Sequence, residues 1–162
     1  MITLNIEFTS PKKSNPFSWL IRRIQGTKYS HVRLSWVNST QTHIIYEASG
    51  SHIKFIGPLA AKDNPVTIHD SFYFDLTNDQ YRELVKICMT YAGLKYSFKQ
   101  VINIGLANLG FRWRPFKSKL EYTQVCSEVV IRVLQTLGIH VNIDPEMSGP
   151  KELNQVLKQL KY

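Results

Sequence analysis

The stretch YSHVRLSWVNSTQTHIIYEA, residues 29–48, contains two runs rich in β-branched and aromatic residues, joined by a short polar segment. The two runs cover residues 30–37 and 42–48. The polar segment 38–41 has the composition and length of a hairpin connection. We therefore predict that two antiparallel strands form a hairpin here.

Further strands are predicted on both sides of the hairpin. Residues 2–8 alternate apolar and polar side chains, and residues 52–56 and 66–74 also have the composition of strands. Between the first strand and the hairpin, a cap and first-turn proline at Ser14-Asn15-Pro16 begin a short helix, which Gly26 ends.

The second half of the chain has helical patterns. Thr77 and Gln80 have the spacing of a capping box for a helix that runs to Gly93, and an apolar helix is predicted over 97–109. A basic aromatic loop, FRWRPFKSK, follows at residues 111–119.

Two more helices complete the chain. The segment CSEVVIRVLQTLG begins at Cys126 and has apolar residues at helical spacing, with Thr123 as the predicted N-cap. Gly149-Pro150 begins a last amphipathic helix. The predicted strands lie mostly in the first half of the chain and most of the helices in the second half. This order predicts an α+β fold, with a small antiparallel sheet or half-barrel packed against helices. With 162 residues, positions 1–162 are expected to form a single domain.

The net charge of +8 indicates a basic surface. Such a surface is typical of a well-solvated protein, and it also favours an anionic polymer, an anionic membrane surface or nucleic acid as a partner. A nucleic-acid partner is not favoured, because the sequence contains no recognisable nucleic-acid-binding module. The oligomeric state is left open.

The N-terminal residues MITLNIEF do not have the pattern of a signal peptide, and no apolar run approaches the roughly 18 to 20 residues of a spanning helix. The protein is therefore expected to be cytoplasmic as synthesised, with a virion or cell-wall destination left open. The two cysteines do not form a CxxC pair or a zinc-type spacing, so no disulfide, metal or cofactor is expected.

Cys126 is the candidate nucleophile. A catalytic cysteine reacts as its thiolate, and the positive end of a helix dipole together with the free backbone N–H groups of the first turn stabilises a negative sulfur. Cys126 is predicted in such a first turn, whereas Cys88 lies in the middle of a helix. A buried structural role is the alternative for a lone cysteine at this position.

His31 is the candidate base, because it begins the first hairpin strand and is expected near a sheet edge. Glu47 on the returning strand is expected beside it, where the carboxylate would fix the imidazole tautomer and support the imidazolium. If the hairpin register slips, His43 is the alternative third member. The other histidines are expected on the surface or in the sheet: His52, His69 and His140.

Three segments, KYSHVRLSW, IIYEAS and YTQVCSEVV, together resemble the circularly permuted, YiiX-like branch of the NlpC-type papain-like cysteine hydrolases, whose distant relatives include lecithin:retinol acyltransferase. In that branch the histidine and acidic strands precede the cysteine helix, and this chain has the order His31, Glu47, Cys126. The resemblance implies a permuted papain-like fold and a Cys-His-Glu triad.

The segment GLKYSFKQVINIG resembles the glycine-tyrosine segment of the family, which implies that Tyr96 lies beside the nucleophile and helps the Cys126 backbone N–H to bind an oxyanion. A core tyrosine is the alternative. The sequence departs from the family at Arg33, where a small residue is common, and at Ser97, where an acidic residue is common. The substrate groove and its electrostatics are therefore expected to differ.

The resemblance implies a thiol hydrolase that cleaves an amide, peptide or (thio)ester bond. A cell-wall peptide amidase or endopeptidase acting on a peptidoglycan stem comes first, and a lipid acyl hydrolase or acyltransferase comes second. The alternative from another class is a non-catalytic phage or bacterial accessory protein that binds a partner through its basic surface, because a fold does not determine a function.

Overall fold

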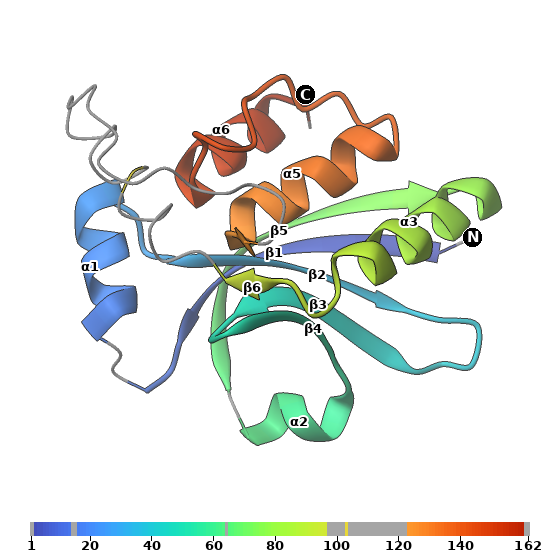
Figure 1. The fold of residues 1–162 in the computed structure, drawn as a ribbon, viewed down its shortest axis with the longest axis horizontal. Coiled ribbons are helices and arrows are strands. Elements are labelled where there is room, and N and C mark those ends of the chain that lie inside the picture. The colour runs from blue at the N-terminus through green and yellow to red at the C-terminus, as the bar shows by residue number, and fades with distance from the viewer. Residues whose placement is uncertain (1, 14–15, 64, 97–102, 104–122, 161–162) are drawn as a thin grey trace.

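The computed structural model describes residues 2–13, 16–63, 65–96, 103 and 123–160 (Figure 1). Its strands pair in one sheet of seven, in the order β5-β1-β2-β3-β4-β6-β7. The strands are β1 Ile2–Pro11, β2 His31–Val37, β3 His43–Ser49, β4 His52–Ile56, β5 Val66–Leu76, β6 Lys95–Tyr96 and β7 Thr123–Gln124. The helices are α1 Pro16–Gln25, α2 Pro58–Asp63, α3 Asn78–Tyr91, α5 Cys126–Thr136 and α6 Pro150–Leu160.

The sheet is antiparallel from β5 to β6, and the short β6 and β7 pair in parallel. The predicted hairpin is confirmed as β2 and β3, in which Leu34 pairs with Tyr46 and Val37 with His43. Gln41 in the connection has a φ of 59°, a left-handed conformation that closes the turn. The α+β class predicted from the sequence is thus the observed one.

One face of the sheet forms the main core. On β2 the side chains of Val32, Leu34 and Trp36 are at most 1% exposed, because they alternate on the face that α5 covers. Helix α5 contributes valines, one isoleucine and one leucine at helical spacing, of which Ile131, Val133 and Leu134 are fully buried. Figure 1 shows α5 and α6 on one side of the sheet and α2 on the other.

Most predicted boundaries agree with the structure. The capping box of α3 is confirmed, since the Gln80 backbone N–H donates to the Thr77 hydroxyl and the Thr77 N–H donates to the Gln80 amide oxygen. The sequence did not predict α2. The predicted helix at 97–109, apart from Asn103, and the predicted loop at 111–119 lie outside the described residues.

The prediction that Thr123 caps α5 is wrong. Thr123 pairs with Lys95 in the short parallel ladder of β6 and β7, and the N-cap of α5 is Val125. Val125 has extended dihedral angles and makes no side-chain cap hydrogen bond. The helix therefore begins at Cys126, and its first backbone N–H groups do not receive a cap from the N-cap side chain.

Among the described residues, none of the helices combines the length and the apolar character that crossing a bilayer demands.

Candidate active site

Cys126 is the first residue of α5, at the end of that helix where the dipole is positive. The residue is 4% exposed. Backbone N–H groups of Val32, on the strand that α5 covers, and of Ser127, the next residue of the helix, hydrogen-bond to the sulfur. The packing of α5 on β2 therefore delivers two donors to the place where a thiolate charge resides.

His31 is the first residue of β2 and forms a side-chain hydrogen bond with Cys126. The expected position near a sheet edge needs correction, because β2 lies between β1 and β3 and is an interior strand. The imidazole instead lies at the end of an interior strand. A backbone hydrogen bond of 3.0 Å from Ser30 N–H to the Thr9 carbonyl fixes the residue that precedes this strand.

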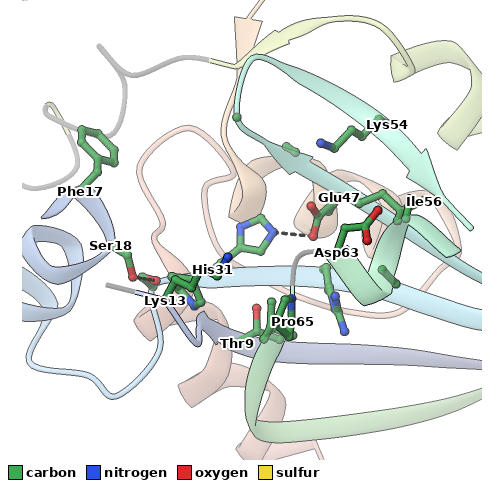
Figure 2. Close-up of a pocket in the computed structure, with 18 of the residues that line it drawn as sticks. Thr9, Lys13, Phe17, Ser18, His31, Glu47, Lys54, Ile56, Asp63 and Pro65 are labelled. Carbon is green, nitrogen blue, oxygen red and sulfur yellow. Dashed lines mark hydrogen bonds and ion pairs between the residues drawn. The ribbon is translucent and has the colours of Figure 1, made fainter. Parts of the chain in front are cut away.

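Glu47 of β3 completes the cluster. Its Oε2 atom is 3.2 Å from Nε2 of His31 (Figure 2), and the two side chains are 10% and 17% exposed, respectively. The register of the hairpin places Glu47 near His31. Leu34 pairs with Tyr46, so the residues that follow Tyr46 on β3 run alongside the first half of β2. Since Nε2 faces Glu47, Nδ1 is the ring nitrogen left for the sulfur.

The surroundings of His31 and Cys126 shift the pKa values of both groups. Burial lowers the pKa of His31, but the negative sulfur of Cys126 and the Glu47 carboxylate outweigh burial and raise it from 6.5 to about 10. Burial also raises the pKa of Cys126, yet the charge and hydrogen bond of His31, with the two backbone N–H donors, bring the net pKa below its usual value. The geometry thus favours a thiolate–imidazolium pair.

Cys88 offers an internal comparison. It lies in α3, is fully buried among apolar side chains, and burial raises the pKa of its thiol far above the usual value. The two cysteines of the chain are both free, so the contrast between them comes from their surroundings and not from a disulfide.

The structure does not bring the alternative third member into the site. His43 pairs with Val37 at the opposite end of the hairpin from His31. His69 contacts the Ser10 hydroxyl at 2.8 Å, and His52 contacts the neighbouring Ser51. Tyr96 is placed by its backbone in β6, beside Gln124, but its side chain and the predicted oxyanion contact lie outside the described part of the chain.

A pocket of about 560 Å³ opens beside His31 and Glu47, which both line it (Figure 2). Its walls are formed by residues from the first 66 positions of the chain. They belong to β1, α1, β2, β3, β4, α2 and the start of β5. Phe17 and Ile21 of α1 and Ile56 of β4 make part of the lining apolar. The pocket is large enough to receive one side of a small substrate beside the histidine.

A buried polar network lies on the same face of the sheet. Arg33 Nε donates to Glu7 Oε2 at 2.8 Å and the Ser35 hydroxyl donates to Glu7 Oε1 at 2.7 Å. The sequence marks Arg33 only as a departure from the family and does not single out Glu7. The available signal was the alternation of polar residues on two paired strands, Asn5, Glu7 and Thr9 on β1 with His31, Arg33 and Ser35 on β2.

Within the described ranges, no three His, Cys, Asp or Glu side chains gather in a way suited to a metal ion. No protein-family model matches the sequence, and a search of curated proteins finds no match. The features of the chain that bear on function are therefore the geometry of Cys126, His31 and Glu47 and the motifs that surround them.

Proposed function

We propose that the protein is a cysteine hydrolase that cleaves an amide, peptide or (thio)ester bond, with Cys126 as nucleophile, His31 as general base and acid, and Glu47 as the residue that orients the histidine. The observation that supports this proposal is the continuous chain of side-chain interactions from Cys126 to His31 to Glu47. A nucleophile, a base and an orienting carboxylate in contact are the parts that such chemistry needs.

The proposed reaction has two stages. The Cys126 thiolate adds to the carbonyl carbon, and the tetrahedral intermediate then collapses and expels an amine, alcohol or thiol that takes its proton from His31. A water molecule next attacks the resulting thioester while His31 accepts its proton, and the acid product leaves as the thiolate re-forms. Backbone N–H groups in the first turn of α5 are suitable donors to the oxyanion of both intermediates.

We further propose that the domain is a circularly permuted papain-like hydrolase. Support comes from the order His31, Glu47, Cys126 along the chain and from the likeness of the three segments that contain these residues. Substrates that this family likeness suggests are cell-wall peptide amides first and lipid acyl groups second.

The decisive experiment measures site-resolved alkylation by iodoacetamide as a function of pH, with Cys88 as the internal control. We expect Cys126 to react well below pH 8 in the wild type, and we expect His31→Ala to move its profile toward that of an ordinary thiol. Hydrolysis of a panel of peptide amides, p-nitrophenyl esters and thioesters should be lost in Cys126→Ala. If Cys126 is as unreactive as Cys88 in the wild type, the hydrolase proposal is wrong and a binding role takes its place.

A further inference from the structure

One wall of the pocket carries polar groups that the proposed hydrolysis does not use. Thr9 of β1 is the register partner of His31, and Arg33 of β2 is the partner of Glu7. Paired residues on adjacent antiparallel strands project from the same face of a sheet. Thr9, His31 and Arg33 therefore share one face, and all three line the pocket.

The guanidinium of Arg33 has N–H groups that its bond to Glu7 does not use. The residue is 8% exposed, and its guanidinium is fixed by the hydrogen bond from Nε to Glu7. Its two terminal amino groups make no hydrogen bond to any residue that the structure describes. A guanidinium held at Nε presents its terminal N–H groups in a fixed, planar arrangement that matches a carboxylate.

Thr9 supplies an independent observation. The residue is fully buried, and its hydroxyl has no hydrogen-bond partner among the described residues. Leaving a buried hydroxyl unpaired is energetically unfavourable, so such groups in native proteins call for an explanation. A ligand oxygen in the pocket would provide the missing partner, because Thr9 lines the pocket beside His31.

The remaining lining indicates the rest of the ligand. Lys13 and Lys54 lie on exposed parts of the lining, as does Asp63, and Glu47 is already paired with His31. Because Glu47 is paired with His31 and Arg33 with Glu7, the two lysines exceed Asp63 by one positive charge, so the pocket suits a single negative charge better than a dianion. Phe17, Ile21 and Ile56 add apolar surface.

We propose that this wall is a subsite for a carboxylate of the substrate, bound by the terminal amino groups of Arg33 and the hydroxyl of Thr9. The substrate would then be an acyl or peptidyl compound with a carboxylate on an apolar group close to the bond that is cleaved. This inference rests on the proposed hydrolase function for the reaction, but the binding of the carboxylate can be measured without it.

The test titrates the wild-type protein with hexanoate and with hexanamide, its neutral analogue, by calorimetry or NMR. We expect hexanoate to bind at least 10-fold more tightly. Thr9→Val keeps the side-chain shape and removes an unpaired hydroxyl, so it should fold normally and weaken hexanoate about fivefold. The double variant Glu7→Gln/Arg33→Gln, which removes both charges together, should abolish the preference, whereas the matched surface control Arg82→Gln should retain it.

Equal binding of the two probes, or a preference that survives both pocket variants, would overturn the subsite. Butyl phosphate serves as a third probe, and if it binds more tightly than hexanoate the assignment to a carboxylate is wrong.

A kinetic comparison separates this inference from the proposed function. The ratio of kcat/KM for mono-p-nitrophenyl glutarate to that for p-nitrophenyl pentanoate should exceed 10 in the wild type and fall toward one in Thr9→Val. Hydrolysis of both esters with a ratio near one in the wild type would leave the hydrolase standing and remove the subsite. If Cys126 is unreactive but hexanoate still binds in an Arg33-dependent way, the carboxylate subsite stands and the hydrolase proposal is wrong.

Discussion

The Nε2 atom of His31 and the Oε2 atom of Glu47 lie 3.2 Å apart, although 15 residues separate them along the chain. The contact joins two strands of one hairpin, and both side chains are largely buried. A carboxylate in such a place does two things for an imidazole: it orients the ring, and it supports the positive charge that the ring carries beside a thiolate.

Glu47→Gln should separate these two effects. The amide keeps the size of the side chain and an oxygen acceptor, but it removes the negative charge that supports the imidazolium. We expect the alkylation profile of Cys126 to shift to higher pH and kcat/KM toward a scissile ester to fall about 100-fold or more. The matched control is Glu83→Gln on the surface of α3, where Lys86, at 3.5 Å, is the one ion-pair partner of Glu83 among the described residues. Wild-type kinetics in Glu47→Gln would show that the carboxylate plays no part.

The reaction should depend on pH in a two-sided way for amide substrates. As pH rises through the lowered pKa of Cys126 the thiolate forms, and as pH rises through about 10 the His31 imidazolium loses the proton that the leaving amine requires. Alkylation needs the thiolate alone, so its rate should rise with the thiolate and not fall near pH 10. Measuring both profiles on one preparation tests the assignment, and amide cleavage that keeps rising beyond pH 10 would contradict it.

The effects of replacing Glu7 and Arg33 on the free energy of unfolding should not be additive, because the two side chains form a buried ion pair. Arg33→Met leaves the Glu7 carboxylate buried with the Ser35 hydroxyl as its one remaining partner in the described part of the chain, and should lower the free energy of unfolding by about 3–5 kcal/mol. Glu7→Gln/Arg33→Met removes both charges and should recover much of this loss. Urea denaturation of the wild type, the two single variants and the double variant closes the cycle, and additive losses would argue against coupling.

Local patterns in the sequence were sufficient to predict where the hairpin and the helix that carry the candidate residues lie. The hairpin that brings Glu47 to His31 follows from two β-rich runs and a polar turn, and the position of Cys126 follows from helical spacing. The backbone donor from Val32 could not be predicted, because it depends on which face of β2 the distant helix α5 covers. The same long-range assembly overrode the local capping preference of Thr123.

The polar wall shows a second limit of sequence reasoning. Alternating polar residues on β1 and β2 were present in the sequence, but only the register that pairs Glu7 with Arg33 and Thr9 with His31 turns them into one surface. Nothing local to either strand specifies that register, since it is set by the burial of the opposite, apolar face.

The capping box of α3 offers a test of local stability away from the site. Thr77→Ala removes the acceptor for the Gln80 backbone N–H and should lower the free energy of unfolding by about 1 kcal/mol. Thr90→Ala in the same helix removes an exposed hydroxyl that donates to the Lys86 carbonyl within the same helix, and should change stability by less than about 0.5 kcal/mol. Equal losses of unfolding free energy for the two substitutions in urea denaturation would show that the capping hydrogen bond stabilises the protein no more than an ordinary hydroxyl of the same helix.

The turn between β2 and β3 lies at the far end of the hairpin from His31 and Glu47, and its residues Ser39, Thr40 and Gln41 are exposed. A fluorophore or a short affinity tag inserted at this turn would leave the strand register and the pocket in place. The turn is thus a suitable attachment point, from which the protein can be immobilised or labelled with the His31 and Glu47 end of the hairpin facing away from the support.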